Sequence, residues 1–203
     1  ESDPVFGAVA ASFNSNTVAS LTYSTVKTNT AVLAEGVGKS FALTTATDNT
    51  AVAGTTKDDV YSALVDLATT NSTLTSSDNI AAGAGADSLT ITATGADDES
   101  VTGVTTSGLE SILLTNLATA GKGLTIDAAL MDGVTSIAVA NSTANGDNTF
   151  TNVGALAAAS MSANAGDLTL TYGTTVVAGT SDTQALTVTG TNGTFTADGI
   201  ETI

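Results

Sequence analysis

The sequence contains no cysteine, no histidine, no arginine and no tryptophan, and it has only one proline among 203 residues. Without histidine or cysteine, the chain cannot form a Ser-His-Asp triad, a Cys-His pair or an ordinary zinc, copper or haem site. Without arginine, it lacks the side chain that clamps phosphate through two parallel hydrogen bonds. These absences exclude most families of enzymes, and we expect a protein that is not an enzyme.

Charge of one sign dominates the chain, with 20 acidic residues against 4 lysines and a net charge of -16. Such a chain repels the phosphate backbone, so we expect no nucleic-acid partner. An anionic membrane surface repels it as well. The metal chemistry that remains is that of hard cations such as Ca²⁺, which bind carboxylate and carbonyl oxygens. Bound calcium would also relieve the repulsion among the carboxylates, which destabilises a compact state.

The sequence has no run of 18 apolar residues, so we do not expect an integral membrane protein. An abundance of Thr, Ser, Ala and Gly without any cysteine suits an exported protein that forms no disulfides. We therefore expect an extracellular protein. The last residues, Gly199 to Ile203, are typical of an apolar strand, which predicts that the protein continues beyond them.

The chain is expected to fold in three parts. Residues 1–38 have apolar side chains near helical spacing and predict an irregular, partly helical segment. Residues 39–100 contain short alternating runs such as Ser88 to Ala93, which predict a β block with acidic turns. Residues 101–203 form a β region with an internal repeat.

The repeat consists of two short strands that recur about every 25 residues, separated by turns rich in Gly, Asn and Asp. The first strand recurs at residues 110–116, 135–141, 159–164 and 184–189. The second recurs at residues 124–127, 150–153, 168–171 and 195–197. A fixed period of this size is typical of stacked units that bury their apolar edges on one another. We predict an all-β protein with a parallel β-solenoid, or β-helix, and keep a β-sandwich as the alternative.

One turn stands out among the acidic turns, Gly83-Ala84-Gly85-Ala86-Asp87. Glycines let a backbone curl so that its carbonyl groups point to one centre, and the aspartate adds a charge. This is the pattern of glycine-rich repeats that bind calcium between stacked turns. A plain solvated turn is the alternative reading of the same residues.

Several segments resemble bacterial S-layer proteins that are related to the RTX proteins. The resemblance rests on the order and spacing of four motifs and covers residues 39 to 203. The motifs are Phe41 to Asp48, Gly54 to Tyr61, Leu74 to Leu89, and the pair Gly108 to Ile112 and Gly199 to Ile203. It implies a secreted structural protein, exported by a type I system, that forms a calcium-dependent lattice on the cell surface.

The resemblance also implies a set of calcium ligands and a set of partners. Carried over by position, the ligands are Asp48, Asp58, Asp59, Asp78, Gly83, Gly85 and Asp87. Residues 39–100 then correspond to an RTX-like calcium-binding block. The expected partners are further copies of the chain, with cell-surface polysaccharide or lipopolysaccharide as a possible anchor.

Two other functions compete with a surface layer. A calcium-stiffened adhesin or extracellular filament would share the acidic composition and would bind glycans or host surfaces. A polysaccharide lyase or epimerase on a β-helix would need carboxylates aided by basic groups, and the chain has few of these.

Overall fold

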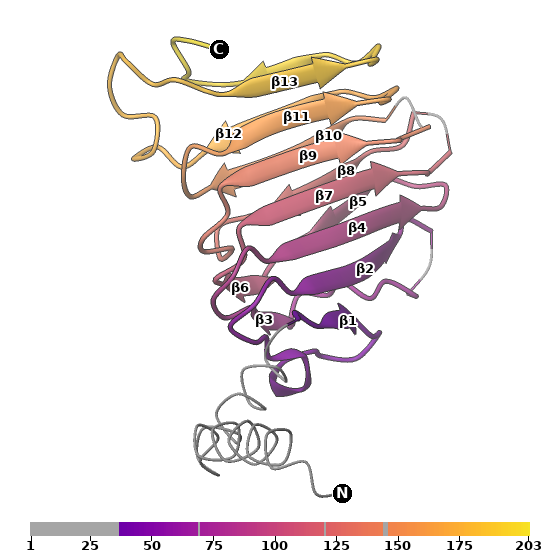
Figure 1. Cartoon of the computed structure of the whole chain (residues 1–203). Helices are drawn as coiled ribbons and strands as arrows, with labels where there is room; N and C mark the ends of the chain where they lie inside the picture. The colour runs from indigo at the N-terminus through magenta and orange to yellow at the C-terminus, as the bar shows by residue number, and fades with distance from the viewer. Residues whose placement is uncertain (1–36, 69, 120, 144–145) are drawn as a thin grey trace, which may run out of the picture. The chain divides into compact units, whose positions relative to one another are not determined.

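The computed structural model describes residues 37–203, apart from residues 69, 120 and 144–145. The helical segment predicted within residues 1–38 therefore lies outside the described residues, except for its last two. Residues 38–203 form one structural unit. This unit is a β-solenoid of about five turns (Figure 1).

Three parallel sheets form the walls of the solenoid. The long sheet has the order β1-β2-β4-β7-β9-β11-β13. Its strands are β1 (Ser40–Ala42), β2 (Val60–Asp66), β4 (Ser88–Thr94), β7 (Ser111–Asn116), β9 (Ser136–Ala140), β11 (Ala158–Ser162) and β13 (Leu186–Thr189). The second sheet has the order β14-β12-β10-β8-β5. Its strands are β5 (Glu99–Val101), β8 (Leu124–Asp127), β10 (Asn148–Val153), β12 (Leu168–Tyr172) and β14 (Phe195–Ala197).

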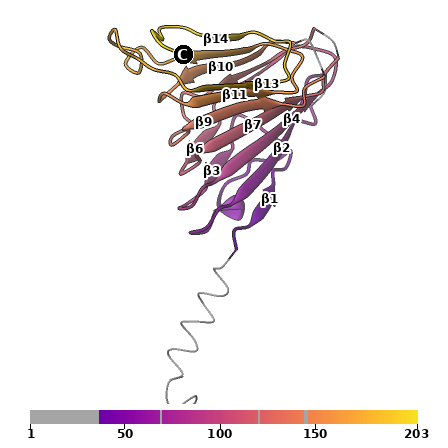
Figure 2. The same cartoon turned by 45° about the horizontal axis from the view of Figure 1, so that its top comes forward.

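The third sheet is small and lies at the early coils. It consists of β3 (Asn79–Ala81) and β6 (Thr105–Ser107), and an isolated bridge joins Thr106 to Met131. A short 3₁₀ helix, η1 (Thr50–Val52), packs beside β3. In the last coil, β13 and β14 lie on the two walls of the solenoid (Figure 2).

The strand pairing confirms the predicted solenoid. Every strand pair of the three sheets is parallel. An immunoglobulin-like sandwich is built from antiparallel sheets, so the alternative was wrong. The repeat of about 25 residues is one coil, since Ser111 pairs with Ser136 in the next strand of the long sheet. The long sheet also runs without interruption from β4 to β7, across residue 100.

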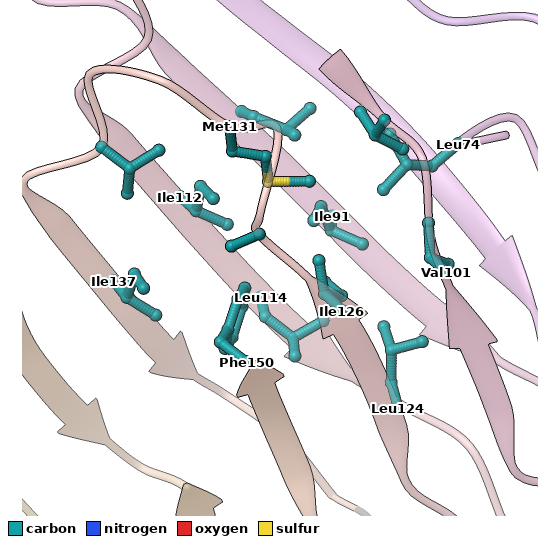
Figure 3. Packing of buried hydrophobic residues seen from close by; sticks show 14 of the residues in the cluster. Leu74, Ile91, Val101, Ile112, Leu114, Leu124, Ile126, Met131, Ile137 and Phe150 are labelled. Atoms are coloured by element: carbon teal, nitrogen blue, oxygen red, sulfur yellow. The ribbon is translucent and has the colours of Figure 1, made fainter. Parts of the chain in front are cut away.

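The core forms because buried apolar residues alternate with outward residues along each strand. In β4 the buried residues Leu89, Ile91 and Ala93 alternate with half-buried serine and threonines, as the period of two in a strand requires. The same alternation in the second sheet places its apolar side chains opposite those of the long sheet. Figure 3 shows Ile112 and Leu114 across the core from Phe150. Branched apolar residues inside and threonines outside both suit a pleated surface.

No helix among the described residues has the length and hydrophobicity that a membrane span requires.

Replacing Phe150 tests the core directly. Phe150 is fully buried in β10, so Phe150→Ala should lower the free energy of unfolding by about 3–5 kcal/mol through lost burial and a residual cavity. Its neighbour Thr149 points outward and is the matched control. Thr149→Ala should cost less than about 1 kcal/mol. Urea unfolding of both variants measures the difference, and equal losses would contradict the assigned register.

Candidate functional site: the carboxylate corners

Four of the aspartates that were predicted as calcium ligands are buried at corners of the coils. They are Asp48, Asp59, Asp78 and Asp87, each no more than 5% exposed. Aspartate is rarely buried unless it is paired, because a desolvated charge is costly. With only four lysines in the chain, the partners of these carboxylates must come from elsewhere.

The partners are main-chain N–H groups. Within its own turn, Asp59 accepts a hydrogen bond from Thr55 N–H through Oδ2, at 2.5 Å. The Thr55 hydroxyl donates to the other oxygen of Asp59, at 3.2 Å. The threonine therefore donates to the carboxylate of the aspartate four residues later in the chain, in a Thr-x-x-x-Asp pattern. Asp48 repeats this arrangement with Thr44, whose N–H lies 2.6 Å from Oδ2.

Asp59, Asp78 and Asp87 also accept hydrogen bonds from the coil before them. Asp59 Oδ1 accepts from Lys39 N–H at 2.5 Å, and Asp87 Oδ1 accepts from Asp59 N–H at 2.6 Å. Asp87 N–H in turn donates to Glu110 Oε2 at 2.8 Å. These three acidic residues occupy the same position on successive coils, since each directly precedes a strand of the long sheet. We name Asp59, Asp87 and Glu110 the carboxylate ladder.

A second corner repeats the principle at the start of β3. Asp48 N–H donates to Asp78 Oδ1 at 2.9 Å, one coil further on. Thr75 N–H donates to Asp78 Oδ2 at 2.7 Å. Both oxygens of Asp78 are thus held by the main chain. Asp78 lies before β3 and Gly83 lies after it, so the predicted ligands divide between two corners.

Asp87 is the exception among the four. Its Oδ2 atom is buried and has no hydrogen-bond partner. The turn before it has Gly83 where Asp59 has Thr55, and Gly83 takes a φ of 102° in the left-handed region that threonine avoids. This turn follows a different course and brings no N–H group to Oδ2. The Tyr61 hydroxyl is the other buried polar atom at this corner without a partner.

The electrostatics of the ladder follow from these contacts. Burial acts to raise the pKa of Asp59, but the hydrogen bonds from Lys39 and Thr55 outweigh it, so the pKa lies below the ordinary value. Burial raises the pKa of Asp87, and the nearby Asp59 and Glu110 carboxylates add to the effect. Burial and the carboxylates of Asp59 and Asp87 raise the pKa of Tyr61 to about 12.

The glycines of the turn serve close approach between coils. A Cβ atom at Gly83 would lie 2.1 Å from the Thr55 carbonyl oxygen, and one at Gly85 would lie 2.6 Å from the Lys57 backbone. The exposed Asp58 side chain also links these two coils, because its Oδ1 atom accepts a hydrogen bond from Ala86 N–H at 2.8 Å. Coil stacking therefore already requires the glycines that suggested a calcium cradle.

The fit to calcium differs among the predicted ligands. The oxygens of Asp59 and Asp78 already face N–H donors, whose positive ends occupy the space that a cation would need. Asp87 Oδ2 is the buried oxygen of the predicted ligands without a hydrogen-bond partner, and the Tyr61 hydroxyl and Thr75 Oγ1 are buried oxygens near these corners that also lack one. Calcium takes six to eight oxygen ligands. Within the described ranges, no group of three or more acidic side chains is placed to hold a metal ion. Calcium at these residues stays a prediction, with Asp87 as its best-supported position.

Several polar residues that position the corners were not singled out from the sequence. Glu110 is one of them, although it lies in the Gly108 to Ile112 motif. The related motif at residues 199–203 behaves alike: Asp182 N–H donates to Glu201 Oε2 at 2.8 Å, the distance seen between Asp87 and Glu110. The recurrence of Gly-x-Glu-Ser/Thr-Ile was the signal that could have identified this role.

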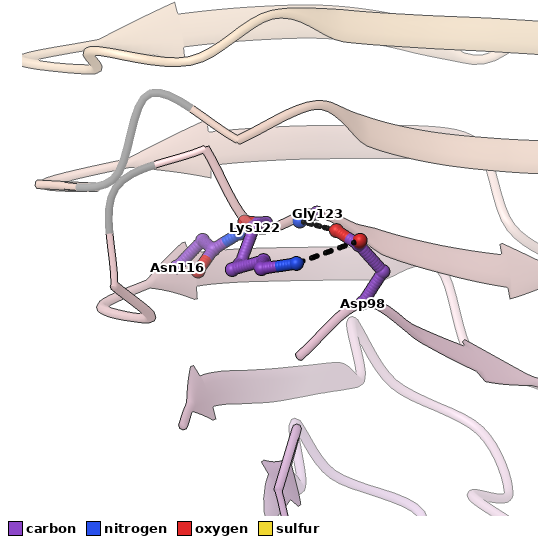
Figure 4. A network of polar contacts seen from close by, with 4 residues as sticks. All are labelled: Asp98, Asn116, Lys122 and Gly123. Carbon is purple, nitrogen blue, oxygen red and sulfur yellow. Dashed lines mark hydrogen bonds and ion pairs between the residues drawn. The ribbon is translucent and has the colours of Figure 1, made fainter. Parts of the chain in front are cut away.

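The opposite end of β7 carries a second set of polar contacts. Asn116 is fully buried; its Nδ2 group donates to Lys122 O at 3.2 Å and to Asn148 Oδ1 at 2.9 Å. Figure 4 shows the adjoining surface contacts, where Asp98 accepts from Gly123 N–H at 2.9 Å and pairs with Lys122 at 3.2 Å. The hydrogen bond from Gly123 and the lysine lower the pKa of Asp98. Here too an acidic side chain ties one coil to the next.

Comparison with protein-family models, with curated proteins and with solved structures finds no match to this chain. The resemblance to S-layer proteins therefore rests on the sequence motifs.

Two substitutions in the ladder should have opposite effects on stability. The fold lowers the pKa of Asp59, so its charged form stabilises the protein at neutral pH, and this contribution is lost as the pH falls through the folded-state pKa. Asp59→Asn removes one of two acceptor oxygens and should cost about 1–3 kcal/mol. The fold raises the pKa of Asp87, so its charged form destabilises the protein above the ordinary aspartate pKa. Asp87→Asn should leave stability unchanged or raise it.

Urea unfolding at pH 7 in EDTA measures both variants. The advantage of Asp87→Asn over the wild type should shrink as the pH falls toward the ordinary pKa of aspartate, because the wild-type side chain then takes up a proton. Equal destabilisation by the two substitutions would contradict the assigned roles.

Proposed function

We propose that this chain is a structural module of an extracellular surface layer, which assembles with copies of itself. The observation that carries the proposal is the use of the buried acidic groups. Four carboxylates each accept a hydrogen bond from a main-chain N–H group of the preceding coil: those of Asp59, Asp78, Asp87 and Glu110. The most costly groups in the core are thus committed to stacking coils, which is what a rigid building element requires.

A role without catalysis agrees with the composition. The chain has no histidine, cysteine or arginine, and the buried carboxylates of Asp59 and Asp78 face N–H donors of the main chain. Export by a type I system and anchoring through polysaccharide or lipopolysaccharide belong to the proposal through the resemblance to S-layer proteins.

Calcium enters the proposal at two kinds of carboxylate. One is the buried Asp87 Oδ2 atom, which has no partner. The others are acids next to the second sheet. Asp98, Asp147 and Asp167 directly precede β5, β10 and β12, on the register that pairs Glu99, Leu124, Asn148 and Leu168. Asp98 and Asp147 are exposed and Asp167 is half-buried. Such a row of carboxylates at the surface suits ions that bridge neighbouring molecules, because calcium accepts ligands from several sources.

A groove on the solenoid favours the adhesin as the second candidate. The groove has a volume of about 520 Å³. Hydroxyl side chains make up most of its lining, with Glu99 as the acidic member: Thr45, Thr70, Ser72, Thr75, Ser76, Ser100 and Thr102. A hydroxyl-lined groove suits a polar ligand such as a glycan. Saturable binding on a glycan array without ordered assembly would favour this function.

Electron microscopy with and without calcium tests the proposed assembly. The purified chain in millimolar Ca²⁺ should form ordered sheets or tubes, and EDTA should dissolve them, because removal of the bridging ions restores repulsion between molecules of net charge -16. Single particles in both conditions would contradict the proposal.

Two variants show which carboxylate binds the ion. Calorimetric titration of Ca²⁺ into dispersed protein should show a binding event that Asp87→Asn removes. Asp78→Asn is the matched control and should retain the event, since the main chain already holds both oxygens of Asp78. Retention of the event in Asp87→Asn would assign calcium to the surface acids alone.

A further inference from the structure

The outer face of the long sheet is almost free of charge. Asp66, at the end of β2, is the one charged residue among its seven strands. The chain as a whole carries a net charge of -16. The acids among the described residues lie instead mostly at the corners of the coils. The flat wall between the corners is therefore the part of the described surface where like-charged molecules repel one another least.

The side chains on this face are small and neutral, with an apolar centre. In β4 and β9 the outward positions are serine, threonine and alanine. Leu64 and Leu113 also point outward and are only half-buried. Leu113 lies beside Thr90 on one side and Ala138 on the other. The outward positions of a sheet with one solvated face are usually polar, so the two leucines make this face more apolar than most.

The second sheet provides a comparison within the same molecule. Its outward residues are also rich in threonine, with Ser100, Thr125, Thr149 and Thr169 in register. This face carries one outward acid within its strands, Asp127 at the end of β8, as the long sheet carries Asp66. The two outer faces therefore share their β geometry, but the long sheet spreads its one acid over seven strands instead of five and has outward leucines.

We infer that the outer face of the long sheet packs against the same face of a second copy of this chain. The inference rests on the proposed self-assembly and names its contact surface. Small side chains allow two sheets to approach to about 10 Å, the usual packing distance. A contact of one face with itself has two-fold symmetry and closes into a pair. The absence of charge within the contact lets the acidic corners remain in solvent around its rim.

The size of the face determines how strong the contact can be. Seven strands about 4.8 Å apart, each about five residues long at about 3.3 Å per residue, give about 500 Å² per copy. The total of about 1,000 Å² is at the lower end of specific interfaces. A single pair should therefore be weak, and other contacts between pairs, such as the proposed calcium bridges, would stabilise it in an array.

The absence of cysteine makes a crosslinking experiment simple. Leu113→Cys places one thiol at the centre of the outer face, near the expected two-fold axis. Thr149→Cys places one on the outer face of the second sheet as the matched control. Mild oxidation of dispersed protein in EDTA should crosslink the Leu113 variant at least tenfold faster. Added NaCl should increase that rate, because salt screens the repulsion between the copies.

A charge substitution tests the same surface without a crosslink. The wild type should associate with rising concentration in sedimentation velocity. Leu113→Asp should abolish this association, whereas Thr149→Asp should preserve it. Circular dichroism and thermal unfolding show whether each variant is folded. Equal crosslinking of the two cysteine variants, or association that persists in folded Leu113→Asp, would overturn the inference.

The two proposals fail in distinguishable ways. Calcium-dependent sheets that still form in Leu113→Asp would retain the surface-layer function and reject this face as the contact. Specific crosslinking through Leu113→Cys without any sheets in calcium would retain the contact and reject the layer.

Discussion

Stacking coils of this solenoid requires a hydrogen-bond acceptor for the main-chain N–H groups at the corners. A buried N–H without a partner costs as much as a lost hydrogen bond. The protein meets this requirement with carboxylates, each of which accepts from the coil before it. Lys39, Asp59 and Asp87 donate in this way to Asp59, Asp87 and Glu110. The acidic composition thus has a structural cause, and the dearth of lysine follows because the carboxylates do not need cations.

This constraint also explains how charge is distributed. Acids at the corners leave the broad walls to residues that suit a sheet, and the long sheet keeps a single charged strand residue. A molecule organised in this way has charged rims and a neutral face. The same division that lets the coils stack leaves one surface on which two copies can meet, and it leaves exposed acids where calcium can join them.

The fold could be predicted from the sequence because one coil equals one repeat. The alternating runs at residues 88–93, 110–116 and 124–127 coincide with strands. The repeat period correctly favoured a solenoid over a β-sandwich. The burial of four aspartates was harder to predict from the sequence, because a Gly- or Thr-rich turn is usually solvated. These are Asp48, Asp59, Asp78 and Asp87. The role of Glu110 depends on which residues lie side by side in successive coils, and that register varies from 20 residues at Ser40 to 28 at Val60.

Hydrogen exchange at single amides tests the central claim most directly. In EDTA, the N–H groups of Asp59 and Asp87 should exchange as slowly as that of Ile112 within β7, because they donate to the buried Asp87 carboxylate and the half-buried Glu110 carboxylate. Asp87→Asn should keep the Asp59 amide protected through its remaining oxygen, whereas Asp87→Ala should expose it. Rapid exchange of both amides in the wild type would contradict the account, since the carboxylates would then not be holding the coils together.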